Sequence, residues 1–457
     1  MPDELLAITP IDGRYHDKVK ELENYFSEFG LIKFRVFIEI SYLCELSGKI
    51  IRSFNDEEKL LLDRILANFS IDDAKKIKEI EKVTNHDVKA VEYFLKEKLK
   101  ETSLKDVLEM IHFGLTSYDV NDSALYLMLK NGIEQVYLPN LKQLIEKILE
   151  FSEKNKNLSI LGRTHGQPAS PTTFGKEFSI FALRLSREYK KLKEIEYYGK
   201  LNGAVGNYNA LYLAYPTLNC VNFSENFLRK IGLKPNLITT QIESHDKFVE
   251  IFQILSRINN ILLDFDQDSW MYISDNYLIQ QTKKEEVGSS VMPHKVNPID
   301  FENSEVNSNI ANAMISGFSK LQISRLQRDL SDSTTTRNFG SVIAYCLLSV
   351  KSAIRGLGKV NPNEKVLREE LEKNPEILSE AIQTILRKEK FEGAYEKLKE
   401  LTRGKEISLQ DLRNFINSLE INLEEKEKLL RLEPSTYIGK AIELTELAIK
   451  ECKELIS

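Results

Sequence analysis

The sequence has few of the residues that build disulfide frameworks or zinc sites. Its 457 residues include four cysteines, which are far apart and show neither a CxxC pair nor Cys/His ligand spacing: Cys44, Cys220, Cys346 and Cys452. The N-terminus lacks the basic start and long apolar run of a signal peptide, and no window approaches the ~20 apolar residues of a membrane span. We therefore expect a protein of the reducing cytoplasm.

The chain also lacks a large excess of charge of either sign. It carries 63 basic and 69 acidic residues, a formal net charge of −6, and 42% of its residues are hydrophobic. This balance argues against a general nucleic-acid or membrane surface, although it leaves room for a local cationic pocket. Length and composition predict a globular protein with substantial hydrophobic cores.

Several common motifs of catalysis and binding are absent. No G-x-S-x-G elbow surrounds Ser289, and no G-x-x-x-x-G-K-[ST] loop is present. Gly203 and Gly206 have neither the third glycine nor the βαβ context of a dinucleotide site, so we interpret them as a tight turn. No two histidines stand at i, i+3 or i+4 spacing, which argues against a metal site. Histidine is better interpreted here as an acid or a base.

Apolar residues recur every three or four positions over long stretches without proline, as in amphipathic helices. One stripe comprises Phe174, Phe178, Phe181, Leu185, Tyr189, Leu192 and Ile195, and a second comprises Phe248, Phe252, Leu255, Ile258, Leu262 and Phe265. No chain of alternating strands joined by hairpin turns is visible. We predict an all-α fold with a long central helical bundle.

Breaks in the helical pattern divide the chain into three predicted domains. Residues 1–111 form an N-terminal helical domain of shorter charged helices, interrupted for example at residues 68–73. Residues 112–361 hold the long apolar stripes and form a central bundle domain. The pattern is interrupted again at Gly356, Gly358 and Pro362, so residues 362–457 form a C-terminal helical domain.

The most informative segment is the loop from Gly288 to Pro298. It places hydroxyl, imidazole and ammonium groups on a glycine-started loop that runs into a helix: Ser289, Ser290, His294 and Lys295. Asn297 suits the N-cap, Pro298 the first helical position and Asp300 a capping-box-like pair. Because helix starts attract carboxylates and phosphates, this loop is a candidate anion site.

Three of the six histidines lie in polar clusters beside helical patterns. They are His86 within residues 84–87, His112 before residues 116–119, and His165 within residues 164–168. Each cluster alone could be a helix cap, because Ser, Thr, Asn and Asp are ordinary capping residues. Three caps that carry histidine are less ordinary, so both capping and acid–base chemistry stay open.

The loop Gly288 to Pro298 resembles the signature G-S-S-x-M-P-x-K-x-N-P of the fumarase/aspartase lyase superfamily. Within that superfamily, residues 9–15, 84–89, 164–168 and 239–243 together resemble the adenylosuccinate lyases. The resemblance extends from residue 9 to the segment 395–404, which is nearly the whole chain. It implies the fold of the superfamily, with three domains around a long central bundle.

The activity implied by this resemblance is a cofactor-free β-elimination. It splits adenylosuccinate into AMP and fumarate, and it releases fumarate from the succinylated imidazole carboxamide ribotide of purine biosynthesis. The chemistry needs a base for the proton beside one carboxylate, donors for the resulting charge, and an acid for the departing nitrogen. The expected partner is therefore a small-molecule substrate, with no nucleic acid and no membrane.

The resemblance also implies catalytic roles. Ser289 is implied as the base, with Lys295 and the following helix start stabilising its anion, although the adjacent Ser290 stays an alternative. His165 is implied as the general acid, oriented or charged by Glu302. His86 is implied to place the substrate and polarise the leaving side, or else to be a cap that only shapes the pocket.

Binding residues and oligomeric state follow from the same resemblance. Substrate contacts are implied at Asn85, Asp87, Thr116, Ser117, Gln241, Lys295 and Asn297, and nucleotide or phosphate contacts at Arg14, Tyr15, Arg328, Ser333 and Arg337. Without the resemblance, Arg328 and Arg337 would be interpreted as surface salt bridges with Asp329 or Asp332. The family implies a homotetramer whose active sites are each assembled from three chains.

Two other hypotheses stay open at this point. A sister lyase of the superfamily would act on argininosuccinate, aspartate or malate, and a helical scaffold would keep the fold without turnover. The flanking motifs favour adenylosuccinate over the sister substrates. Intact Ser289, Lys295, His165 and Glu302 argue against a scaffold.

Overall fold

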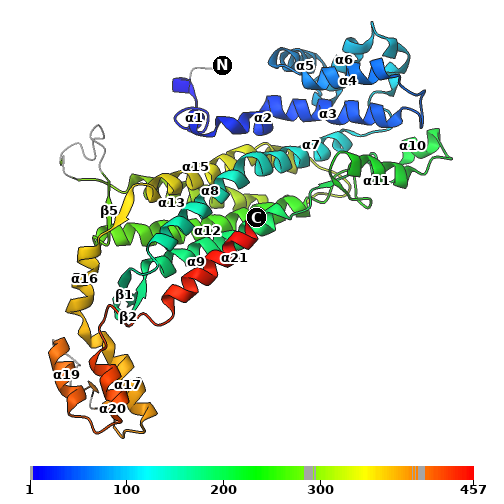
Figure 1. Cartoon of the computed structure of the whole chain (residues 1–457). Helices are drawn as coiled ribbons and strands as arrows, with labels where there is room; N and C mark the ends of the chain where they lie inside the picture. Colours follow the sequence, from blue (N-terminus) through cyan, green and yellow to red (C-terminus); the bar gives the residue numbers. More distant parts are fainter. Residues whose placement is uncertain (1–3, 282–291, 293–294, 394, 397, 400–406) are drawn as a thin grey trace. The chain divides into compact units, whose positions relative to one another are not determined.

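The computed structural model describes residues 4–281, 292, 295–393, 395–396, 398–399 and 407–457. Most of these residues are helical and the strands are short (Figure 1), so the predicted all-α fold is confirmed. The chain forms two compact units. Unit 1 comprises residues 1–141, 191–260 and 306–349, and unit 2 comprises residues 142–190, 261–305 and 350–457.

Unit 1 contains mainly helices: η1 (Glu4–Leu6), α1 (His16–Val19), η2 (Lys20–Leu22), α2 (Glu23–Phe26), α3 (Glu28–Leu46), α4 (Asp56–Ala67), α5 (Ile71–Thr84), α6 (Asp87–Leu99), η3 (Ser103–Met110), α7 (Ser117–Gly132), η4 (Ile133–Tyr137), α10 (Asn209–Ala214), α11 (Cys220–Lys230) and α14 (Ser331–Thr336). Its strands β3 (Tyr198–Gly199) and β4 (Lys234–Pro235) pair in parallel. The long helices with residues in both units are α8 (Leu138–Lys154), α9 (Phe174–Lys193), α12 (Asp246–Ser274), α13 (Ile299–Phe318) and α15 (Phe339–Leu357).

Unit 2 contains α16 (Glu364–Lys373), η5 (Pro375–Leu378), α17 (Ser379–Lys388), α19 (Leu409–Asn417), α20 (Leu423–Leu430) and α21 (Ala441–Leu455). It also contains two antiparallel strand pairs, β1 (Ser159–Thr164) with β2 (Gln167–Thr173) and β5 (Leu278–Gln280) with β6 (Val360–Pro362). Leucine and isoleucine side chains of η5, α17, α19 and α20 share one buried cluster. The expected break after the central stripes is present, because α15 ends at Leu357 and Asn363 caps α16.

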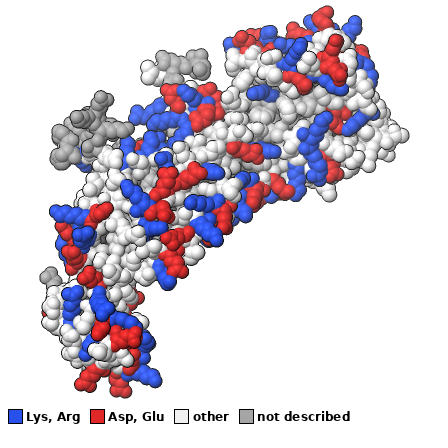
Figure 2. All heavy atoms as spheres, in the orientation of Figure 1, with Lys and Arg blue, Asp and Glu red and all other residues white. Residues whose placement is uncertain are grey.

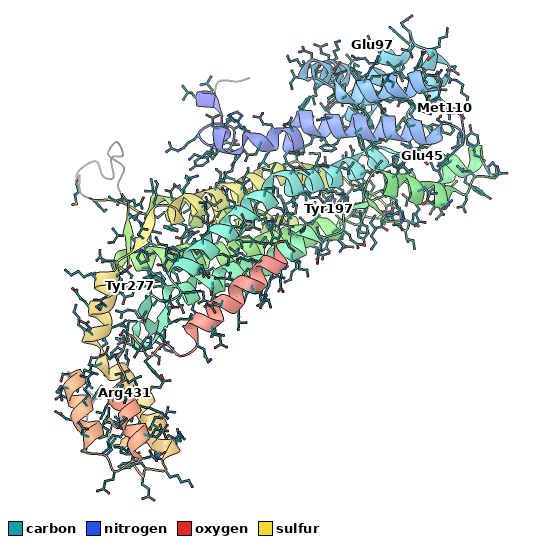
Figure 3. The ribbon with its side chains drawn as sticks, in the orientation of Figure 1. Glu45, Glu97, Met110, Tyr197, Tyr277 and Arg431 are labelled. Carbon is teal, nitrogen blue, oxygen red and sulfur yellow. The ribbon has the colours of Figure 1, made fainter. Side chains whose placement is uncertain are left out.

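Helix α3 is central to the N-terminal part of unit 1. It packs against α4, α5, α6 and α7, and its buried Ile32, Val36, Ile40 and Leu43 share a hydrophobic core with α4, α5 and α6. Its last turn carries Glu45, labelled in Figure 3, which accepts a hydrogen bond from Lys230 of α11 at 3.1 Å. The predicted break at residues 68–73 is confirmed: α4 ends at Ala67, and the Ser70 side chain caps α5.

The two long apolar stripes lie where the sequence predicts helices. Phe174, Phe178 and Leu185 of α9 are buried, and so are Phe248, Phe252 and other stripe members of α12: Leu255, Ile258, Leu262 and Phe265. The apolar periodicity therefore faces the core on both helices. The boundaries of the three predicted domains stay a prediction.

One segment differs from the expectation for residues 164–168. They form a β-hairpin in which β1 and β2 pair antiparallel and Thr164 lies opposite Gln167, so the capping interpretation is wrong for His165. Both residues between the strands have positive φ, 54° at His165 and 73° at Gly166. Two central residues with positive φ match the twist of a tight hairpin, which explains why strands form here within a helical protein.

Two details of the long helices also correct the sequence analysis. Helix α13 begins at Ile299, so Pro298 precedes the helix instead of occupying its first position. By length and composition alone, the helical stretch Ser331–Leu357 could cross a membrane, although no such span is expected from the sequence. However, 67% of its apolar window is buried inside the protein, which is typical of a core helix.

Charged side chains of both signs are interspersed over the face drawn in Figure 2. This agrees with the near balance of basic and acidic residues in the chain. Any concentration of positive charge must therefore be sought in a particular pocket.

Candidate active site

The turn between α5 and α6 and the first residue of α6 together carry three residues with implied substrate roles. Asn85 ends α5 in the left-handed conformation, with φ 51°. His86 is the N-cap of α6, where its Nδ1 accepts the Lys89 N–H at 3.1 Å, while its side chain remains 51% exposed. The imidazole therefore caps a helix and still reaches the surface, so the geometry is compatible with both interpretations of His86.

Asp87, in the first turn of α6, is held by a buried arginine. Arg35 of α3 donates from Nη2 to Asp87 Oδ2 at 2.6 Å, and the Val88 N–H donates to Asp87 Oδ1 at 2.8 Å. Burial alone would raise the pKa of Asp87, but the charge of Arg35 and these hydrogen bonds hold it below its ordinary value. Asp87 is therefore a fixed carboxylate at neutral pH.

Thr116 and Ser117 form the start of α7, and Asp119 organises them. The Asp119 carboxylate accepts the Thr116 N–H at 2.8 Å, which closes a capping box. The same carboxylate accepts the ammonium of Lys200 at 2.7 Å and the N–H of Gly203 at 3.2 Å. Asp119 thus joins the start of α7 to the loop at residues 200–206.

The loop at residues 239–245 carries Gln241, whose Nε2 donates to the Ala204 carbonyl at 3.2 Å. Two buried groups further along this loop bind Asp122 of α7: the Glu243 N–H at 2.7 Å and the imidazole of His245 at 3.0 Å. Burial alone would lower the pKa of His245, but the charge of Asp122 and this hydrogen bond raise it. The loop that carries Gln241 is therefore held against α7, the helix that Thr116 and Ser117 begin.

The predicted tight turn at Gly203 and Gly206 is confirmed, since φ is 82° and 80° at these positions. A Cβ atom at Gly206 would lie 2.0 Å from the Thr239 carbonyl oxygen. Only glycine allows the two loops to approach this closely.

The partners of the Arg328 guanidinium lie inside the protein and not at its surface. Its guanidinium pairs with Asp332 at 2.7 Å, with side chains only 13% and 5% exposed, and it stacks on the Tyr118 ring at 3.8 Å. Asp332 was one of the two partners expected for Arg328, but the expected surface location is wrong, because the pair is largely buried. Asp332 lies on α14, next to Ser333.

A cavity of about 120 Å³ in unit 1 brings together three of the implied binding residues. Asp87, Ser333 and Arg337 line it, together with Arg35 and Glu28. Arg337 donates from Nη1 to Glu28 at 3.0 Å, and its Nη2 lies 3.9 Å from Asp87. The cavity therefore combines two guanidinium groups with two carboxylates and admits a polar, charged ligand group.

The implied nucleotide contacts near the N-terminus are not among the residues that line this cavity. Arg14 is exposed, and Tyr15 lies in the turn before α1, where its N–H donates to the Pro10 carbonyl at 2.8 Å. The described chain therefore does not bring these two residues into the cavity that Asp87, Ser333 and Arg337 line.

Unit 2 carries the remaining predicted residues. His165 is exposed at the tip of the β1–β2 hairpin. Lys295 is also exposed, and Asn297 is half-buried just before α13. Glu302, in the first turn of α13, accepts a hydrogen bond from the Trp270 indole at 3.3 Å. Ser289, Ser290 and His294 lie outside the described residues.

Five residues that hold the segments with implied substrate contacts were not predicted from the sequence: Arg35, Asp119, Asp122, Lys200 and His245. A weak signal existed for Arg35, because it interrupts the apolar stretch around Val36 in a helix that must pack on both sides. Asp119 could have been found as the acidic residue three positions after Thr116, which is the capping-box spacing. The residues that pair with these side chains are distant in the sequence, so spacing along the chain could not identify them.

Comparison with known proteins defines the class first. A sequence model of the family described as Lyase matches residues 13–314. The fold matches a fumarate lyase from Mesorhizobium sp. BNC1 with a TM-score of 0.77 and 18% identity over 95% of this chain and 97% of that one. It also matches a 3-carboxy-cis,cis-muconate lactonizing enzyme from Pseudomonas putida with a TM-score of 0.75 and 17% identity over 96% and 98%. The chain has the lyase fold.

More similar sequences identify the family within this class. A second model, described as Adenylosuccinate lyase C-terminal, matches residues 324–438. The chain is 50% identical to the adenylosuccinate lyase of Haemophilus influenzae over 97% of this chain and 98% of that one, and 48% identical to that of Escherichia coli strain K12 over the same shares. The chain belongs to the adenylosuccinate lyase family, so the resemblance noted in the sequence is confirmed.

Proposed function

We propose that this chain cleaves adenylosuccinate to AMP and fumarate, and releases fumarate from the succinylated imidazole carboxamide ribotide of purine biosynthesis. The observation that carries the proposal is 50% identity to an adenylosuccinate lyase over 97% of the chain. The reaction is a β-elimination that breaks a carbon–nitrogen bond: a base removes a proton beside one carboxylate, and an acid protonates the departing nitrogen. No cofactor or metal is part of the proposal.

The base in this proposal is Ser289, with the neighbouring Ser290 as the alternative. A serine hydroxyl needs nearby positive charge to lose its proton, and Lys295 supplies it on the same loop. The first N–H groups of α13, which begins at Ile299, provide further stabilisation for the anion that forms on the serine.

His165 is the general acid of the proposal, and Glu302 orients it or stabilises its charged form. The exposed position of His165 on a two-residue hairpin turn suits an imidazole that reaches toward another surface. His86 places the substrate on the leaving side, since its ring is half exposed at the start of α6. A neutral pKa range lets histidine deliver a proton at physiological pH.

The nucleotide part of the substrate is assigned to unit 1. Ser333 and Arg337 line the cavity with Asp87, and a guanidinium pairs well with phosphate oxygens. Further substrate contacts are Asn85, Thr116, Ser117, Gln241 and Asn297, and further nucleotide contacts are Arg14, Tyr15 and Arg328.

We also propose a cytoplasmic homotetramer whose active sites are each assembled from three chains. Support comes from α13, where Ile299, Val306 and Ile310 are exposed and recur at intervals of seven and four residues, which places them on one face of the helix. An apolar helix face of this kind needs a covering partner. Size-exclusion chromatography with light scattering tests the assembly, and a stable monomer at working concentration would contradict it.

The function is tested by incubating the purified chain with adenylosuccinate and, separately, with argininosuccinate while fumarate release is measured. Release from adenylosuccinate alone is the expected result. Release from argininosuccinate would instead assign a sister lyase activity, and no release from either substrate would favour a helical scaffold.

A further inference from the structure

Helix α3 presents a buried polar face to the segments that carry implied substrate contacts. Arg35, Glu39 and Tyr42 are only 3%, 0% and 0% exposed, and their spacing of four and three residues places them on one side of the helix. Burying polar or charged side chains is costly unless each finds partners. The partners of these residues all lie in segments that lead to implied substrate contacts.

The first partner segment is the start of α6. Arg35 Nη2 donates to Asp87 Oδ2 at 2.6 Å, while Arg35 Nε donates to Asn121 Oδ1 at 2.8 Å. Asn121 lies on α7, so one planar guanidinium joins α3, α6 and α7. The distance between the Asp87 turn and α7 is thus set by the fixed fork of a single side chain.

The second partner segment is the loop that enters α7. Glu39 Oε1 lies 2.6 Å from His112 Nδ1, and the Tyr42 hydroxyl donates to the Phe113 carbonyl at 2.8 Å. His112 has φ 59°, so the chain turns sharply at this point. These contacts fix the loop that continues through Thr116 into Ser117, the first residue of α7.

A stability role alone does not account for this arrangement. Buried ion pairs contribute little net stability compared with apolar residues of the same volume, because their desolvation is costly. They do restrict the geometry of the groups that they join. If α3 needed only to be stable, apolar side chains would suit these three positions, as they do at its other buried positions Val36 and Ile40.

We propose that the polar face of α3, formed by Arg35, Glu39 and Tyr42, holds residues 85–87 and 116–117 at the spacing that the substrate requires. Arg35 is the main positioning residue, because it binds Asp87 directly. The inference rests on the proposed function of these two segments, and it gives Arg35, Glu39 and Tyr42 a role that acts through the residues to which they bind.

The decisive experiment uses Arg35→Ala and measures fumarate release from adenylosuccinate with and without millimolar guanidinium chloride. We expect KM to rise by about tenfold or more with a smaller change in kcat, because a binding geometry is lost. Added guanidinium should lower the KM of this variant toward that of the unmodified chain, and the effect should saturate as its concentration rises. The reason is that guanidinium places the same planar donor in the space that the arginine side chain has left. Methylammonium should not lower the KM. Arg35→Lys should stay impaired, because an ammonium cannot reproduce the two-way fork.

Arg52→Ala is the matched control. Arg52 also joins two carboxylates of unit 1, Glu58 at 2.8 Å and Asp106 at 2.7 Å, but it does not line the cavity. We expect a lower Tm and an unchanged KM for this variant. An Arg35→Ala variant that behaves in the same way, with lower Tm, unchanged KM and no guanidinium rescue, would overturn the positioning role.

Tyr42→Phe covers the case in which Arg35→Ala does not fold. It removes one hydroxyl and keeps the ring that packs edge-on against Phe223 and Phe227. A rise in KM of about threefold is expected, and an unchanged KM would contradict the proposal. Absence of fumarate release by the unmodified chain would instead contradict the proposed function, so the two failures are distinguishable.

Discussion

Lys200 and Asp119 form an ion pair in which Nζ and Oδ1 are 2.7 Å apart and both side chains are fully buried. Removing one partner of such a pair leaves an uncompensated charge in the interior, which costs more than the pair contributes. We predict that Lys200→Met lowers the free energy of unfolding by about 3 kcal/mol, the lower end of the usual range, because backbone N–H groups still bind Asp119. Denaturant unfolding measures this value.

The matched control for Lys200→Met is Arg229→Ala. Arg229 pairs with Glu225 at 2.8 Å on the surface of α11, and exposed pairs contribute about 0–1 kcal/mol. If both variants lost the same small free energy of unfolding, the buried pair would contribute no more to stability than the exposed one.

The stability contribution of His245 should depend on pH. The charge of Asp122 and its hydrogen bond raise the pKa of His245 above the ordinary value despite burial. A raised pKa in the folded state means that this contribution is complete below about pH 6.5, the usual pKa of histidine, and is lost as pH rises through the folded-state pKa. We predict that the difference in unfolding free energy between the unmodified chain and His245→Gln shrinks as pH rises from 6. A difference that grows with pH would contradict the assignment.

Glu28 should compete with the substrate phosphate for Arg337. Its carboxylate accepts a hydrogen bond from Arg337 at 3.0 Å, and the neighbouring cations of Lys78 and Arg337 hold its pKa below the ordinary value, although partial desolvation opposes this shift. It is therefore ionised at neutral pH. We predict that Glu28→Gln tightens AMP binding about two- to fivefold, the range expected when an ion pair of up to about 1 kcal/mol is removed from the free protein. Calorimetric titration with AMP gives the Kd.

Glu225→Gln is the control for Glu28→Gln, because it removes a carboxylate from an arginine pair elsewhere in unit 1. Its AMP affinity should equal that of the unmodified chain. Weaker AMP binding by Glu28→Gln would mean that Glu28 supports the site and does not compete for it.

Ser289→Ala and His165→Ala should each abolish turnover while the oligomer stays intact. The reason is that one variant lacks the proposed base and the other the proposed acid. If the two residues of one site come from different chains, mixing the variants and letting subunits exchange should recover part of the fumarate release. Substantial activity in either single variant would refute its assignment, and no recovery on mixing would refute the shared site.

Gly206→Ala should disturb the loop that carries Gln241. At this position φ is 80° and a Cβ would lie 2.0 Å from the Thr239 carbonyl oxygen. We predict a loss of unfolding free energy of more than about 1 kcal/mol together with a higher KM. Gly439→Ala separates backbone strain from this clash, because Gly439 has φ 53° but no atom within 4 Å of the added Cβ. Equal effects in both variants would exclude the clash as the cause.

The sequence was a good guide wherever local pattern controls structure. The stripes of α9 and α12 face the core as predicted, because a helix that repeats every 3.6 residues places such positions on one side. The break at residues 68–73 was also predictable, since Ser70 and Asp73 form a capping box from their spacing alone. The constrained pattern around residues 288–298 indicated the family, which the comparisons confirm.

Local pattern failed where two interpretations of a polar cluster compete. Residues 164–168 contain the same kinds of residue as a helix cap, yet they form a hairpin, because the flanking segments pair as the antiparallel strands β1 and β2, and β1 buries Ile160 and Leu161. His86, by contrast, does cap a helix. The two clusters differ in what the flanking segments pack against, which the clusters themselves do not encode.

The sequence by itself determined the helical fold, the family and the residues that carry its motifs, because periodicity and constrained local patterns are written along the chain. Only the tertiary structure decided that Arg35 holds Asp87, that Asp119 joins α7 to Lys200, and that Glu28 faces Arg337. These partners lie 52, 81 and 309 positions apart. Contacts between charged side chains at such separations depend on how helices pack, and no local spacing specifies that packing.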